Sequence, residues 1–156
     1  MPRSAQQWFD EYGSSHQNPT NKLIHWLMVP TIFFTIVGLL WNLPLPTPLT
    51  NIQGVNWASI ILIPVLIFYA SLSWTLMLGM LAFSLVCFML PWQIDISTSW
   101  PLWQISLTLF VIAWIFQFIG HKIEGKKPSF FKDVQFLLIG PAWLLGFIYR
   151  KLGIHY

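Results

Sequence analysis

The segment that decides the fold runs from Trp57 to Trp92 and reads WASIILIPVLIFYASLSWTLMLGMLAFSLVCFMLPW. None of its 36 residues is charged. A helix needs about 20 residues to cross the hydrocarbon core of a bilayer, so this stretch is too long for one crossing and suits two short ones. We expect the turn between them near Ser71 to Trp74.

The apolar character extends well beyond this segment. Between Lys22 and Lys122 the only charged side chain is Asp95. The whole chain of 156 residues is 56% hydrophobic and 8% charged, whereas soluble domains are about 25% charged. No polar segment is long enough for a second domain. The sequence therefore predicts an all-α integral membrane protein, a helical bundle of four to five transmembrane segments in one domain over residues 1–156.

The limits of these segments follow from prolines and polar residues. After a cytoplasmic N-terminal segment of residues 1–22, we expect spans at about 23–43, 57–72, 74–92 and 102–120. The prolines at positions 44, 46 and 48 end the first span, because proline lacks the amide donor and clashes with the preceding turn. A last apolar segment, 134–149, is short and interrupted by Gly140 and Pro141. It is either a fifth span or a re-entrant segment.

Basic residues predict which side of the membrane each end faces. Lys and Arg accumulate in cytoplasmic loops, and they occur here before the first span and directly after the fourth. Four spans return the chain to its starting side, so both basic segments are expected in the cytoplasm. The net charge of +3 thus indicates topology rather than binding of nucleic acid.

The first of two histidine-containing blocks precedes the first span. His16 and His25 flank an Asn18-Pro19 pair, which is typical of a turn or a helix start. Asn21 lies four residues before His25 and shares its helix face. An asparagine there could orient the imidazole, the usual task of a residue behind a metal ligand.

The second block closes the fourth span. Gln117, His121 and Glu124 follow at spacings of four and three residues, so they project from one side of a helix. A histidine and a carboxylate three apart occur in metal sites of helical bundles. Gly120 would allow close packing against a neighbouring helix.

The two blocks together indicate a metal site at the cytoplasmic face. Ionisable residues at a membrane edge are costly to bury and are therefore candidates for function. The lone Cys87 excludes a multi-thiolate site, and nitrogen and oxygen ligands suit Fe, Mn or Zn. Glu124 could be a ligand, an acid–base group or the partner of a lysine.

Both blocks resemble the small membrane family typified by the fungal 2-hydroxy fatty acid dioxygenase. The residues that carry the resemblance are His16 to His25, Val29 to Ile32, Trp114 to His121, then Glu124, Lys126, Lys127 and Pro128, and more weakly Gly140 and Pro141.

The resemblance implies an Fe(II)-dependent dioxygenase that uses O₂ to shorten long-chain 2-hydroxy fatty acids by one carbon. It implies His16, His25 and His121 as iron ligands and Glu124 as the catalytic residue. Asn21 and Gln117 would support the ligands, and Lys122, Lys126 and Lys127 would face the anionic head of the substrate.

Two other functions fit the same residues. One is a non-enzymatic membrane scaffold or lipid-binding protein, and the other is a zinc-dependent membrane hydrolase. In either case the protein lies in the lipid bilayer, the bacterial inner membrane or the endoplasmic reticulum of a eukaryote. The sequence predicts no particular oligomeric state.

Overall fold

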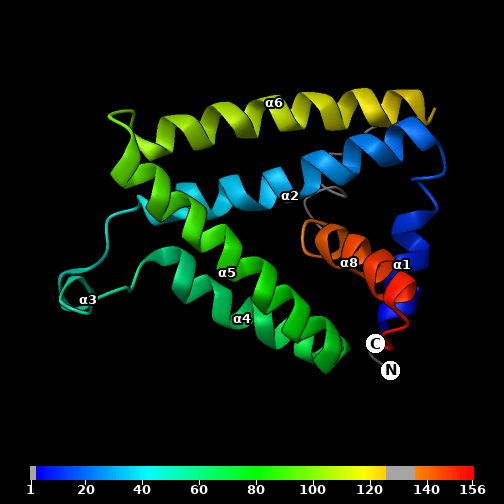
Figure 1. The fold of residues 1–156 in the computed structure, drawn as a ribbon, viewed down its shortest axis with the longest axis horizontal. Coiled ribbons are helices and arrows are strands. Elements are labelled where there is room, and N and C mark those ends of the chain that lie inside the picture. The colour runs from blue at the N-terminus through cyan, green and yellow to red at the C-terminus, as the bar shows by residue number, and fades with distance from the viewer. Residues whose placement is uncertain (1–2, 126–135) are drawn as a thin grey trace.

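A computed structural model describes residues 3–125 and 136–156. Within these residues the protein consists of helices joined by short loops (Figure 1). The helices are α1 (Ala5–Gly13), α2 (Pro19–Trp41), α3 (Thr47–Thr50), α4 (Trp57–Leu72), α5 (Trp74–Ser97), α6 (Leu102–Ile123) and α8 (Ile139–Leu152). The expected fold class, an all-α membrane bundle, is confirmed.

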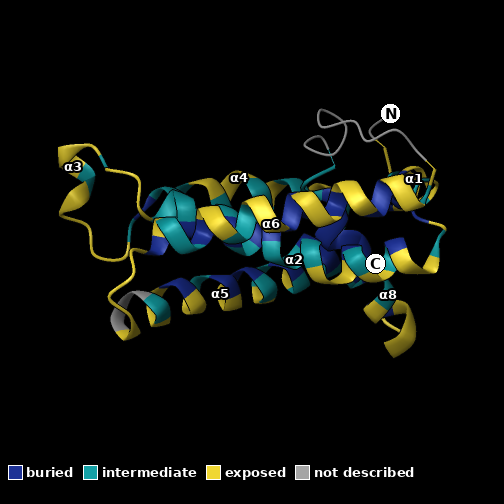
Figure 2. Ribbon diagram, turned by 90° about the horizontal axis from the view of Figure 1, so that it is seen from above, coloured by how far each residue is buried: buried dark blue, intermediate teal, exposed yellow. Residues whose placement is uncertain are grey.

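Three helices are long and apolar enough to cross a membrane. They cover Pro19–Trp41, Trp74–Ile94 and Leu102–Ile123, whereas α4 is a shorter apolar helix. Large apolar side chains face outward, among them Ile63 and Ile67 of α4, whose exposed fractions are 61% and 64%. Figure 2 shows that exposed residues of all kinds occur along the lengths of the helices. An outer surface of this kind is stable against lipid rather than water. The exact limits of each crossing stay predictions.

Helices α2 and α6 lie side by side along their lengths (Figure 1). A glycine enables the close approach at the end where α6 finishes, because a β-carbon on Gly120 would collide with the side-chain oxygen of Asn21. Small residues allow such approaches between helices in membranes. The contact brings the start of α2 beside the end of α6, about a hundred residues further along the chain.

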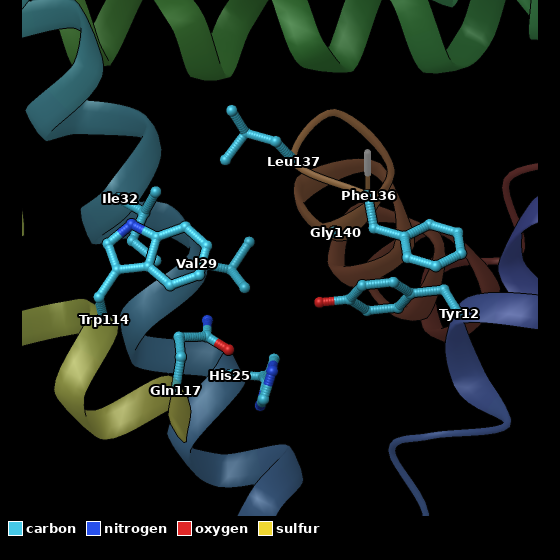
Figure 3. Close-up of a pocket in the computed structure, with 9 residues that line it drawn as sticks. All are labelled: Tyr12, His25, Val29, Ile32, Trp114, Gln117, Phe136, Leu137 and Gly140. Carbon is cyan, nitrogen blue, oxygen red and sulfur yellow. The ribbon is translucent and has the colours of Figure 1, made fainter. Parts of the chain in front are cut away.

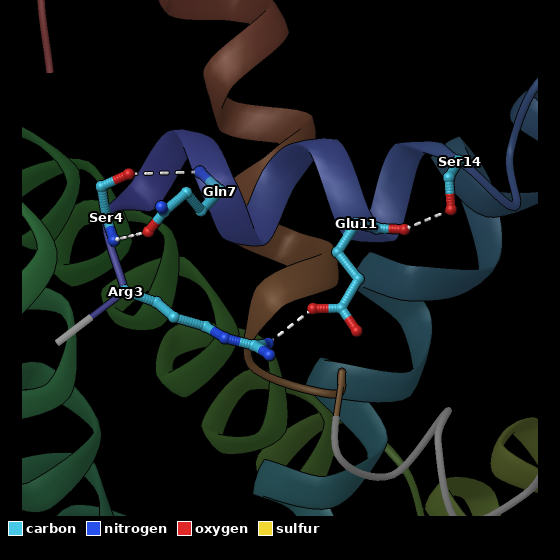
Figure 4. Close-up of polar contacts among 5 residues, drawn as sticks. All are labelled: Arg3, Ser4, Gln7, Glu11 and Ser14. Carbon is cyan, nitrogen blue, oxygen red and sulfur yellow. Dashed lines mark hydrogen bonds and ion pairs between the residues drawn. The ribbon is translucent and has the colours of Figure 1, made fainter. Parts of the chain in front are cut away.

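Helix α1 lies in the N-terminal segment, for which the sequence analysis proposed no helix. Ser4 accepts from the amide of Gln7, and the Gln7 side chain accepts from the Ser4 amide (Figure 4). This reciprocal pair is a capping box, which satisfies two amide donors at the helix start. Ala5, Phe9 and Tyr12 form the buried face of the helix. The capping pattern and the spacing of these residues are the signals that could have predicted it.

Helix α8 begins at the Gly140-Pro141 pair instead of being interrupted there. Proline is tolerated in a first turn because the amides there have no partner within the helix. Tyr69 donates to the carbonyl of Leu138 at 2.6 Å, and Tyr149 donates to the carbonyl of Thr75 at 2.8 Å. Both ends of α8 therefore lie near the α4–α5 turn. The two alternatives for this segment, a fifth span and a re-entrant segment, stay predictions.

Candidate metal centre

Three histidines from three helical segments meet at one end of the bundle. His16 follows α1, His25 lies in α2, and His121 lies in the last turn of α6. Each side chain is buried, with exposed fractions of 2%, 1% and 5%. Their ring centroids are 4.1 to 5.5 Å apart. We call this group the histidine trio.

Backbone carbonyls orient two of the three rings. Nδ1 of His16 lies 2.6 Å from the carbonyl oxygen of Tyr12, and Nδ1 of His25 lies 2.9 Å from that of Asn21. A carbonyl oxygen only accepts hydrogen bonds, so each Nδ1 carries the proton and donates. In the neutral ring Nε2 is then the unprotonated nitrogen that can bind a metal.

The dimensions of the trio fit one metal ion. One ligand nitrogen from each histidine lies within 4.8 Å of the other two. Three nitrogens that each lie about 2.1 Å from one ion are about 3.4–3.6 Å apart in a tetrahedral or trigonal arrangement. Each ring therefore needs to move toward the ion by less than about 1 Å. Three imidazoles suit Zn, Fe or Mn and leave further coordination positions for other ligands. No carboxylate or thiolate in the described ranges, 3–125 and 136–156, joins this group.

Glu124 lies beside the trio and ties the α1–α2 turn to the end of α6. Its Oε1 accepts from the amide of Gln17 at 2.7 Å. Its Oε2 accepts from the amide of Asn18 at 2.9 Å and from the Asn21 side chain at 3.1 Å. Asn18 is the N-cap of α2, so the carboxylate also faces the positive end of that helix. We call this set of three hydrogen bonds the Glu124 latch.

The latch affects the ionisation of Glu124. Partial burial opposes the charged form, but the hydrogen bonds from Gln17, Asn18 and Asn21 outweigh this effect. The pKa of the Glu124 carboxyl is therefore below its ordinary value. An ionised carboxylate that accepts these three hydrogen bonds is well suited to fixing the segment that carries His16 beside the segment that carries His121.

A small cavity opens beside His25. Tyr12 and Gln117 direct their polar ends toward it, and Val29 and Trp114 supply apolar walls (Figure 3). Its volume of about 30 Å³ exceeds the roughly 10–15 Å³ that one small molecule such as water requires. The trio thus borders a space where a small ligand could reach it.

Tyr12 is a site residue that the sequence analysis missed. Its ring stacks on the His16 ring with centroids 4.2 Å apart and planes at 18°. A β-carbon on Gly140 would lie 3.1 Å from the Tyr12 hydroxyl. Glycine at this position therefore avoids a tight contact with the hydroxyl. The only available signal was the position of Tyr12 on the apolar face of an unrecognised helix.

The remaining predicted residues are placed as follows. Gln117 is buried and faces the cavity next to His25. Asn21 does support His25, but through its backbone carbonyl, while its side chain holds Glu124. The role of Asn21 behind a metal ligand stays a prediction. Lys122 is exposed, and Lys126 and Lys127 lie outside the described residues.

Fold and site together define a small helical membrane protein with a buried three-histidine centre at one end of its bundle. Comparison with known proteins identifies the family. The chain belongs to the Mpo1-like family, because the model described as 2-hydroxy-palmitic acid dioxygenase Mpo1-like matches residues 2–152. The family resemblance drawn from the two histidine blocks is confirmed.

A curated relative from Saccharomyces cerevisiae is named 2-hydroxy-palmitic acid dioxygenase MPO1. It is 30% identical over 146 residues, which cover 91% of this chain and 78% of the yeast protein. No solved structure matches the chain.

Proposed function

We propose that this protein is a membrane-embedded dioxygenase that acts on long-chain 2-hydroxy fatty acids and removes one carbon. His16, His25 and His121 would hold Fe(II), with the site facing the cytoplasm. The observation that carries the proposal is the convergence of three buried histidines beside a cavity. Membership in the Mpo1-like family and the name of the yeast relative support the substrate class.

The reaction balances without an external reductant. The carboxyl carbon of the 2-hydroxy acid leaves as CO₂, and the carbon that bore the hydroxyl becomes the new carboxyl group. O₂ accepts the electrons that are released, and the shorter acid, CO₂ and one water together contain the three oxygen atoms of the 2-hydroxy acid and the two of O₂. A bound Fe(II) would supply the site at which O₂ and the 2-hydroxy acid meet.

The protein's own residues perform positioning and desolvation. The carbonyls of Tyr12 and Asn21 keep Nδ1 of two histidines protonated and leave Nε2 as the ligand atom. Tyr12 and Gln117 offer a hydroxyl and an amide to the polar head of the substrate beside His25. The apolar walls exclude bulk water, which strengthens these polar contacts. Lys122, and Lys126 and Lys127 beyond the described residues, would attract the carboxylate at the membrane surface.

The latch geometry favours a positioning role for Glu124. All three of its hydrogen bonds go to the α1–α2 turn and the start of α2. The catalytic role expected from the resemblance stays a prediction. It can be separated from positioning by comparing stability and turnover in the same variant.

Turnover by the purified protein tests the proposal. The protein in detergent is loaded anaerobically with Fe(II), then given a long-chain 2-hydroxy fatty acid with or without O₂, and the products are identified by mass spectrometry. We expect a fatty acid one carbon shorter, formed only with both iron and O₂. The matched control is the unsubstituted fatty acid of equal length, which lacks the hydroxyl and should react far more slowly.

Each alternative gives a different result in this experiment. Activity that needs Zn²⁺ and persists without O₂ would redirect the assignment to a hydrolase. Failure to bind metal at stoichiometric levels after anaerobic loading would leave a scaffold or lipid-binding protein.

A further inference from the structure

The cavity beside the trio shares a wall residue with a second, larger cavity. Leu137 lines both. The second cavity has a volume of about 130 Å³ and lies between α2, α4, α5 and the start of α8. All of its lining residues are apolar, and they include Ile36, Leu40, Ala58 and Phe88. We call this second cavity the α2–α4 groove.

One face of α2 connects the trio to this groove. His25, Val29 and Ile32 line the smaller cavity, and Ile36 and Leu40 line the groove. These five positions are spaced by three or four residues, so they form one stripe along the helix. After His25 the stripe carries no polar side chain.

We propose that the α2–α4 groove holds the acyl tail of the substrate, with its methyl end near Leu40, Ala58 and Phe88. This inference rests on the proposed function for the chemistry of the head group. The fifteen residues from His25 to Leu40 rise about 22 Å, whereas an acyl tail fills one leaflet of about 15 Å, half of the hydrocarbon core. Only a long tail in an extended conformation therefore reaches the end of the groove at Leu40, and a shorter tail ends near Ile36.

The groove also gives the tail a way in from the bilayer. Ile61 of α4 lies on its rim and is 39% exposed. Entry between α2 and α4 lets the tail pass from lipid to groove without crossing water, which avoids the cost of hydrating its methylenes.

A third cavity, also apolar, could hold the tail, but it has no connection to the cavity at the histidine trio. It has a volume of about 120 Å³, lies between α2, α5 and α8, and is lined by residues such as Met80 and Leu145. It shares no lining residue with the cavity at the trio. The rings of Phe33 and Phe83, with centroids 5.1 Å apart, stand between it and the α2–α4 groove.

Photo-crosslinking tests the position of the tail without requiring turnover. The probe is a long-chain 2-hydroxy fatty acid with a diazirine near its methyl end, irradiated with the full-length protein and mapped by mass spectrometry. We expect labels on residues around Leu40, Ala58 and Phe88, suppressed by excess unmodified 2-hydroxy acid. Labels on Met80 or Leu145, labels scattered over lipid-facing positions, no labels, or suppression only by phospholipid would each overturn the proposal.

Chain-length selectivity provides a second measurement. Ala58→Leu fills the far end of the groove, so the ratio of kcat/KM for a long over a medium-chain 2-hydroxy acid should fall about tenfold. Phe88→Ala empties it and should raise that ratio, which keeps the test decisive if the first variant fails to fold. The control is Ile63→Phe on the lipid-facing side of α4, which should leave the ratio unchanged. Unchanged ratios in both groove variants would refute the tail's position.

The two proposals can fail separately. Labels in the groove without turnover would contradict the dioxygenase assignment and leave an acyl-binding groove. Turnover with labels elsewhere would keep the enzyme and remove the groove from its substrate site.

Discussion

Replacing Glu124 by glutamine should destabilise the protein by breaking one side of the Glu124 latch. Both carboxylate oxygens accept hydrogen bonds, but a glutamine side chain has only one oxygen. Its best orientation keeps the bonds from Asn18 and Asn21 and turns an amide group toward the Gln17 N–H. One hydrogen bond is lost and two donors face each other.

The expected cost follows from that count. The lost contact with Gln17 is exposed, so water can satisfy part of its donor and the cost is about 1 kcal/mol. In a protein of this size that corresponds to a fall in Tm of roughly 2–4 °C. Glu124→Ala removes all three bonds and should cost about 2–4 kcal/mol.

Thermal unfolding in detergent, followed by circular dichroism, measures these shifts. The control is Glu11→Gln, which removes an ion pair of 2.6 Å with Arg3 (Figure 4). Those side chains are 54% and 50% exposed, so the pair contributes only about 0–1 kcal/mol. If Glu124→Gln and Glu11→Gln unfold at the same temperature, the latch does not stabilise the protein as argued. Loss of turnover at unchanged Tm would instead support a catalytic role.

The stabilisation by the latch should also depend on pH. The folded state lowers the pKa of Glu124, so its contribution is complete above the ordinary carboxyl pKa of about 4.3 and declines as pH falls through the lower folded value. The difference in Tm between the wild type and Glu124→Gln should therefore be constant above about pH 6 and shrink below about pH 4. A difference that grew toward acid would mean that the folded protein prefers the protonated carboxyl.

Two further predictions concern the trio and the orientation of the protein. His25→Ala and His121→Ala should each abolish stoichiometric metal binding, measured by elemental analysis of the purified protein, and leave membrane insertion intact. The control variant His155→Ala, near the C-terminus, should bind metal normally. Full metal occupancy in the first two variants would exclude His25 and His121 as ligands. In intact cells, Ser14→Cys should be shielded from an impermeant thiol reagent and Ser97→Cys should react; the reverse pattern would place the site on the outer side.

The general form of the protein was predictable because it depends on composition. A run without charges can be stable only in lipid, and prolines and lysines mark where it stops. The metal-site hypothesis came from rare polar residues in an apolar chain, where His25 and His121 are conspicuous. The structure places their rings 5.2 Å apart.

The supporting contacts could not be predicted in the same way, because they depend on tertiary geometry. Nothing in the local sequence shows that Glu124 faces the amides of Gln17 and Asn18, which lie more than a hundred residues earlier. The Gly140-Pro141 pair was ambiguous for another reason, because proline can end one helix or lie in the first turn of another.

The backbone contacts of His16 and His25 have a consequence for how the site forms. Each ring donates to the carbonyl of the residue four positions earlier in its own segment. The orientation of each ligand is therefore encoded locally and can exist before the helices associate. Assembly then needs only to bring preset rings together, which lowers the entropic cost of capturing an ion. A designer could move such a segment into an unrelated helical bundle and keep the tautomer of the histidine, because the carbonyl that fixes the tautomer belongs to the same segment.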